Sequence, residues 1–214
     1  MAGRSSGRRD QPASTPAEQA WSAGGGWPRW VLASAVGWAV GATTLWAAEW
    51  AGARNVGGGL AAGAAAGAAL GILQWLVLRR HVARVGWWAV GSTVGFAVSG
   101  GIVWLWGWFL AVAAGGAVAG VLQWLVLRRA LRRAGWWVVA STAGWVTGGV
   151  IGGVGGAVVV AVVGKAVGEA VGQALFWAGY GALAGAVYGG LTGTVLLSLL
   201  PQRPAQQNAA GSSA

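Results

Sequence analysis

The chain has 214 residues, of which 56% are hydrophobic and only 8% are charged, and it contains 41 glycines and 17 tryptophans. A soluble domain carries about 25% charged residues, so this composition excludes an ordinary soluble protein and favours an integral membrane protein. The absence of cysteine excludes disulfide bonds, iron–sulfur clusters and thiolate zinc sites.

The two ends of the chain differ from the part between them. Residues 1–26 are rich in Ser, Gly, Pro, Gln and Arg, and residues 201–214 are rich in Gln, Ala and Ser. Such segments bury too little apolar surface to offset the entropy of ordering. We predict a disordered cytoplasmic arm over 1–26, a membrane domain over 27–200 and a disordered cytoplasmic tail over 201–214.

The membrane domain contains six apolar stretches that are long enough to cross a bilayer. A transmembrane helix needs about 20 mostly apolar residues. We therefore predict an all-α integral membrane protein with six transmembrane helices, paired into hairpins over about 30–78, 87–127 and 136–200. The predicted spans are 30–48, 56–78, 87–105, 108–127, 136–164 and 174–200.

The basic residues predict how these spans are oriented. Twelve of the fourteen Lys and Arg residues lie before the first span, in the second and fourth connections or in the tail. An excess of Lys and Arg marks the cytoplasmic side of a membrane protein, so both termini are expected in the cytoplasm. Because Arg outnumbers Lys thirteen to one, which is typical of GC-rich genomes, we expect the plasma (inner) membrane of a prokaryote.

An internal repeat lies in the middle of the chain. The string QWLVLRR occurs at 74–80 and again at 123–129, and 19 of 30 positions are identical between 67–96 and 116–145. This period indicates repeated structural units. Two-helix repeats keep one orientation in the membrane, so the three hairpins are predicted to share a pseudo-threefold axis along the membrane normal.

Small residues recur every fourth position in the even-numbered spans. Within lipid, helices associate through close packing of small residues rather than through the hydrophobic effect. We predict a tightly packed bundle with these glycines at helix contacts. They are Gly63, Gly67, Gly71, Gly116, Gly120, Gly181 and Gly185.

Three polar residues occupy related positions in the hairpins: Gln74, Gln123 and, by a weaker match, Tyr188. An amide buried in hydrocarbon costs free energy unless it is paired. Two interpretations stay open at this point. The three side chains converge on the axis as a polar path or a hydrogen-bonded ring, or they lie about one turn from the arginine pairs and reach headgroups or water.

The arginine pairs end the second and fourth spans. Long basic side chains at such a position extend toward lipid phosphates, and each one near an anionic leaflet contributes about 1 kcal/mol. We therefore predict contacts with anionic headgroups for Arg79, Arg80, Arg128 and Arg129, with a protein partner as the alternative.

Residues for catalysis are scarce. The chain has one His and four acidic residues, and only Glu49 and Glu169 lie near the predicted outer face, where each is expected to meet water unless the two form a pair. Gly164 and Lys165 are followed by Ala166 rather than Ser or Thr, so a phosphate-binding loop is excluded. We expect no enzyme activity, no cofactor, no metal site and no nucleic-acid partner.

The repeated GxLQWLVLRR element followed by GWW resembles uncharacterised prokaryotic multi-pass membrane proteins that carry the same element. The resemblance covers roughly residues 30–200 and implies topology but no chemistry. Our hypothesis is a non-enzymatic scaffold or lipid-associated helix bundle. The alternative is a small-solute or ion channel or transporter with a path near Gln74, Gln123 and Tyr188, and a homo-oligomer or a membrane-protein partner remains open.

Overall fold

The computed structural model describes residues 25–82, 85–131, 133–164 and 167–199, and over these ranges the chain is helical without a strand. Nearly all of the predicted arm and the whole predicted tail lie outside the described residues.

Six helices are long and apolar enough to cross a membrane, as the sequence predicts, so the chain has the architecture of a multi-pass membrane protein. Two short segments accompany them: a 3-10 turn η1 (Val85–Trp87) before α4 and a π-helical turn η2 (Val160–Gly164) after α6. The six helices are α2 (Gly26–Trp50), α3 (Val56–Leu78), α4 (Trp88–Trp106), α5 (Trp108–Leu127), α6 (Trp136–Val159) and α8 (Glu169–Leu199).

Local sequence explains where several helices begin. Asn55 precedes α3, and its side-chain oxygen accepts a hydrogen bond from the backbone N–H of Gly58 at 2.9 Å, which is the usual role of an N-cap residue. Gly107 alone joins α4 to α5 with φ 82°, a conformation that favours glycine. The predicted sixth span started too late. α8 begins at Glu169, whose negative charge is favourable in the first turn of a helix.

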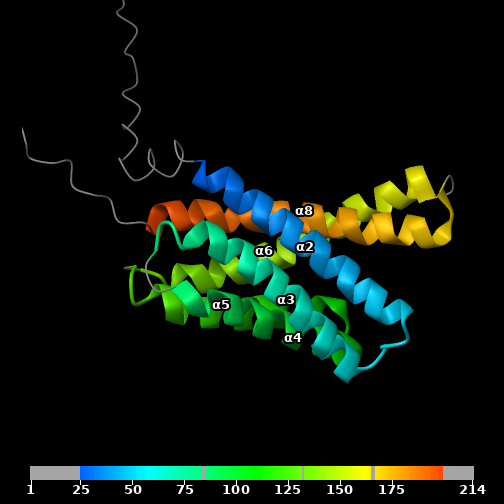
Figure 1. Cartoon of the computed structure of the whole chain (residues 1–214), viewed down its shortest axis with the longest axis horizontal. Helices are drawn as coiled ribbons and strands as arrows, with labels where there is room; N and C mark the ends of the chain where they lie inside the picture. The colour runs from blue at the N-terminus through cyan, green and yellow to red at the C-terminus, as the bar shows by residue number, and fades with distance from the viewer. Residues whose placement is uncertain (1–24, 83–84, 132, 165–166, 200–214) are drawn as a thin grey trace, which may run out of the picture.

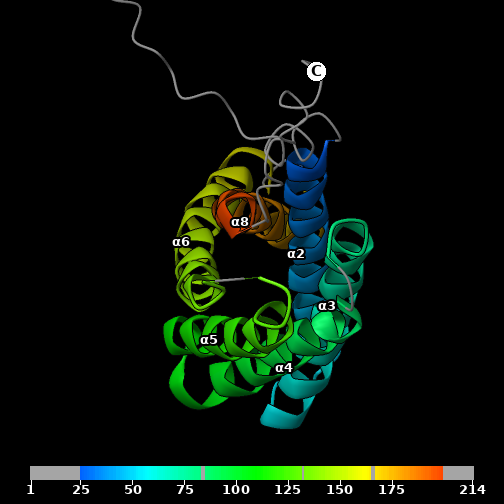
Figure 2. The same ribbon diagram turned by 90° about the vertical axis from the view of Figure 1, so that its left-hand side faces the viewer.

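The helices form a closed ring in chain order. Each packs against the helix before it and the helix after it, and α8 packs against α2 to close the ring (Figure 2). The start of α2, the end of α8 and the connections between α3 and α4 and between α5 and α6 lie at one end of the bundle (Figure 1). We call this the basic end, because Arg79, Arg80, Arg128 and Arg129 follow α3 and α5 there.

Large apolar side chains cover the outside of the ring. Leu32 is 63% exposed, Val139 56% and Val154 65%. So many exposed apolar side chains are unfavourable in water and favourable in hydrocarbon, which agrees with a bilayer as the surrounding solvent.

All seven predicted packing glycines face a neighbouring helix. A Cβ on Gly67 would collide with the carbonyl oxygen of Ser92 in α4, and a Cβ on Gly185 would collide with that of Ser34 in α2. These contacts bring backbones together, so they leave no room for any larger residue.

Candidate functional site

Three tryptophans fill the axis of the ring near its basic end. Trp30, Trp88 and Trp137 lie near the starts of α2, α4 and α6, and each has 0% of its surface exposed. Their ring centroids lie 5.2 to 6.2 Å apart with interplanar angles of 63 to 73°. This is the edge-to-face geometry that aromatic pairs prefer. We call these three residues the indole layer.

Each indole of this layer donates a hydrogen bond to a neighbouring helix. Trp88 Nε1 donates to Gln74 Oε1 at 3.1 Å, and Trp137 Nε1 donates to Gln123 Oε1 at 3.0 Å. Trp30 Nε1 donates to Thr192 Oγ1 at 3.1 Å. Every buried indole N–H of the layer is therefore satisfied.

Each glutamine amide also donates a hydrogen bond through its nitrogen, in addition to the one that its oxygen accepts. Gln74 Nε2 donates to Ser34 Oγ and Gln123 Nε2 donates to Ser92 Oγ, each at 3.0 Å. Because both glutamines are buried (0% and 1% exposed), they do not reach headgroups or water. These hydrogen bonds join the glutamines to serine and tryptophan side chains, and a polar path or a ring formed by the three predicted residues stays a prediction.

Tyr188 lies one helical turn deeper than the indole layer. Its ring packs 6.0 Å from Trp38, and its side chain interacts with those of Ser141 and Gln74. The acceptor for Trp30 is Thr192, a residue that the sequence analysis did not single out. The glycine spacing that matches Gly67, Gly71 and Gln74 fits both residues, one turn apart along α8, so spacing alone does not choose between them.

A second aromatic layer blocks the axis halfway along. Trp38, Phe96 and Trp145 lie four residues beyond Ser34, Ser92 and Ser141, and their ring centroids are 4.5 to 5.1 Å apart. All three are buried among α2, α4 and α6. The axis is thus filled by rings at two depths.

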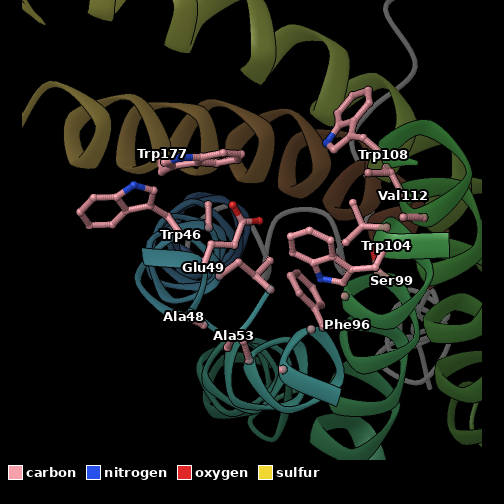
Figure 3. Close-up of a pocket in the computed structure, with 18 of the residues that line it drawn as sticks. Trp46, Ala48, Glu49, Ala53, Phe96, Ser99, Trp104, Trp108, Val112 and Trp177 are labelled. Atoms are coloured by element: carbon pink, nitrogen blue, oxygen red, sulfur yellow. The ribbon is translucent and has the colours of Figure 1, made fainter. Parts of the chain in front are cut away.

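Beyond this layer the axis opens into a pocket of about 100 Å³ at the end opposite the basic end. All six helices contribute to its wall, which is mostly apolar, and we call it the outer vestibule. Figure 3 shows the carboxylate of Glu49 pointing into the space between Trp46, Trp177 and Trp104. The sequence placed Glu49 at the outer face, but its position in an axial pocket follows only from the closed ring.

The two arginines of each repeated pair have different surroundings. The guanidinium of Arg79 lies over the ring of Trp75 at 4.9 Å, and that of Arg128 lies over Trp124 at 5.1 Å. Their neighbours Arg80 and Arg129 instead line two apolar grooves on the outside of the bundle.

No model of a known protein family matches this chain, and neither a search of curated proteins nor a search of solved structures found a match.

Groups suited to catalysis are dispersed. Within the described ranges no three His, Cys, Asp or Glu residues gather as a metal site would require. Glu49 lines the outer vestibule whereas Glu169 does not. His81 is exposed at the basic end, with its Nδ1 3.2 Å from the carbonyl oxygen of Val77. The arrangement is suited to binding, with two apolar grooves that each include an arginine at one end and an aromatic pocket with one carboxylate at the other.

Proposed function

We propose that this protein is a non-enzymatic helix bundle of the prokaryotic plasma membrane, with both termini in the cytoplasm, and that it binds anionic lipids as a lipid-associated scaffold. The observation that carries the proposal is the placement of Arg80 and Arg129. Each lies at the basic end of an apolar groove within one hairpin.

The first groove, of about 530 Å³, runs between α2 and α3, and its wall includes Leu32, Val36, Leu76 and Arg80. Leu32, Val36 and Leu76 are each at least 38% exposed, so they face the surroundings of the bundle. An acyl chain along such a wall gains contact with apolar side chains, while the arginine meets the phosphate.

The second groove, of about 390 Å³, repeats this arrangement between α4 and α5. Val90, Leu122 and Leu125 form its apolar wall, and Arg129 lines it near the basic end. The first groove is also lined by Arg29 and His81, but both grooves combine an apolar wall with the second arginine of a repeated pair, which favours a common ligand. A phospholipid combines an apolar chain and an anionic group in one molecule, as both grooves require.

Arg79 and Arg128 support the proposal by contrast. Each lies over its own tryptophan, an arrangement that holds the guanidinium against the bundle. We therefore assign lipid phosphate to the second arginine of each pair and stabilisation of the helix end to the first.

The filled axis gives less support to the alternative, a channel or transporter. A path along Gln74 and Gln123 requires their amides to exchange partners with a solute, yet both ends of each amide are already hydrogen-bonded. Flux into proteoliposomes tests this point. Replacing both glutamines with leucine should leave flux unchanged for any solute, and a selective change in flux would favour transport.

We also propose that the three hairpins are related by a pseudo-threefold axis. Supporting this are sets of residues from α3, α5 and α8 that share a depth and are fully buried, above all Leu78, Leu127 and Leu196, each four residues beyond an acceptor for an indole N–H. With this register Thr192 takes the place of the third glutamine, and Tyr188 corresponds to Leu70 and Ala119.

The lipid proposal is tested by counting bound phospholipids. The protein is purified in detergent, mixed with phosphatidylglycerol or phosphatidylcholine, and examined by native mass spectrometry. We expect up to two tightly bound phosphatidylglycerols, and we expect the double change Arg80→Gln plus Arg129→Gln to weaken their binding about fivefold or more per site, since each basic residue contributes about 1 kcal/mol.

The matched control is Arg79→Gln plus Arg128→Gln, which removes the same charge from adjacent positions. It should retain most of the phosphatidylglycerol binding. Equal losses in the two double variants would indicate attraction by net charge alone, and equal binding of both lipids by the parent would overturn the assignment of an anionic ligand.

A further inference from the structure

The outer vestibule has a composition unlike the rest of the axis. Its wall combines apolar residues with the rings of Trp46, Trp104, Trp108 and Trp177, and Glu49 is the one acidic side chain among the described residues that line it. The indole layer and the second aromatic layer lie between it and the basic end. A molecule that enters from the outer side therefore meets a pocket with aromatic walls, whose inner end is blocked by the second aromatic layer.

Glu49 gives this pocket a negative charge. It belongs to the last turn of α2, is partly buried, and points into the space between the surrounding rings (Figure 3). Among the residues that the structure describes, no cation forms an ion pair with it, and Arg54, in the next connection, is exposed and does not line the pocket. Within the described part of the chain, this carboxylate is therefore left for a ligand of opposite sign.

The indoles select the kind of cation. The face of an aromatic ring attracts a cation, tryptophan most strongly, and this attraction suits organic ammonium ions because their methyl or methylene groups also gain from apolar surroundings. A small inorganic cation would need several oxygen ligands. Among the described residues that line the pocket, only Ser99 and Tyr180 add side-chain oxygens to those of Glu49.

We propose that the outer vestibule binds the ammonium group of a small organic cation, with Glu49 supplying the charge and Trp104, Trp108 and Trp177 supplying ring faces. The ammonium group belongs either to a free solute or to a lipid headgroup of the outer leaflet. This inference does not depend on the lipid grooves, which lie at the other end of the bundle.

Calorimetric titration of the whole protein in detergent tests the proposal. The probe is choline, which has a quaternary ammonium group and one hydroxyl, and the comparison compound is 3,3-dimethylbutan-1-ol, its neutral isostere. We expect choline to bind at least about tenfold more tightly than the isostere. Glu49→Gln should weaken choline binding by a similar factor, and Trp177→Leu by about threefold or more.

Glu169→Gln is the matched control, because it removes the other acidic charge of the membrane domain from a residue outside the vestibule. It should bind choline as the parent does. Size-exclusion profiles and melting temperatures establish that each variant is folded. Equal binding of choline and its isostere, or unchanged choline binding in a folded Glu49→Gln variant, would overturn the proposal.

A second arm separates the two sources of the ammonium group. The choline titration is repeated in nanodiscs of phosphatidylcholine and in nanodiscs of phosphatidylglycerol. If a lipid headgroup occupies the vestibule, phosphatidylcholine should suppress binding of free choline and phosphatidylglycerol should not. If the ligand is a free solute, choline should bind equally in both, and either result supports an ammonium site.

Discussion

The indole N–H of Trp88 donates to the side-chain oxygen of Gln74 at 3.1 Å, and both residues are buried at 0% exposure. The bond joins the end of α3 to the start of α4, across a basic connection of the bundle. The bond therefore joins the first hairpin to the second and pairs an amide that is buried inside the bundle.

Replacing Gln74 with leucine tests how much this bond contributes. The variant leaves the Trp88 N–H without an acceptor and the Ser34 hydroxyl without its donor, so we expect a loss of about 1–3 kcal/mol in the free energy of unfolding. Denaturation in mixed micelles measures it. In the double variant Gln74→Leu plus Trp88→Phe, the loss should be smaller than the sum of the single losses, because donor and acceptor are removed together. Strict additivity would mean that the pair is not coupled.

Thr192 and Thr194 provide a matched pair within α8. Thr192 accepts the indole N–H of Trp30, whereas the exposed Thr194 donates only to the carbonyl oxygen of Gly190 in its own helix. We expect Thr192→Val to lower the free energy of unfolding by about 1 kcal/mol and Thr194→Val to leave it nearly unchanged. If the two variants melted at the same temperature, Thr192 would not be the partner of Trp30.

Alanine substitutions at Gly185 and Gly190 distinguish the effect of helix packing from the effect of helix propensity. A Cβ on Gly185 would collide with the backbone of Ser34, and a Cβ on Gly190 would meet nothing within 4 Å. Gly185→Ala should therefore force α8 away from α2 and cost about 1–3 kcal/mol. Gly190→Ala should leave the melting temperature unchanged or slightly higher. The reverse order would contradict the contact that closes the ring.

Cysteine accessibility tests the predicted orientation, and the natural chain helps because it has no cysteine. Ala51 and Ala130 are both exposed, in connections at opposite ends of the bundle. A membrane-impermeant maleimide should label Ala51→Cys in intact cells and Ala130→Cys only after the cells are opened. Labelling of Ala130→Cys in intact cells would reverse the orientation that the arginines predict.

The sequence by itself predicted that the chain lies in a bilayer and which segments form its helices. Hydropathy is a local property, so six apolar stretches predict six helices within a few residues at most ends, and α3 and α5 were predicted at their observed bounds. The early start of α8 was missed because residues 169–173 are too polar to be recognised as part of a span, although Glu169 and the chain beyond it form one helix. The repeat was also visible, since identity at a fixed offset requires no structure.

Only the tertiary structure decided which polar groups meet. Gly67, Gly71 and Gln74 have a spacing that fits Tyr188 and Thr192 equally well, and contacts across α8 and α2 are needed to choose the register. The sequence likewise gives both arginines of a pair the same charge, and only the geometry of the helix end directs one onto a tryptophan and the other into a groove. The outer vestibule exists because α8 returns to α2 and closes the ring, a contact between residues far apart in the chain that no local pattern specifies.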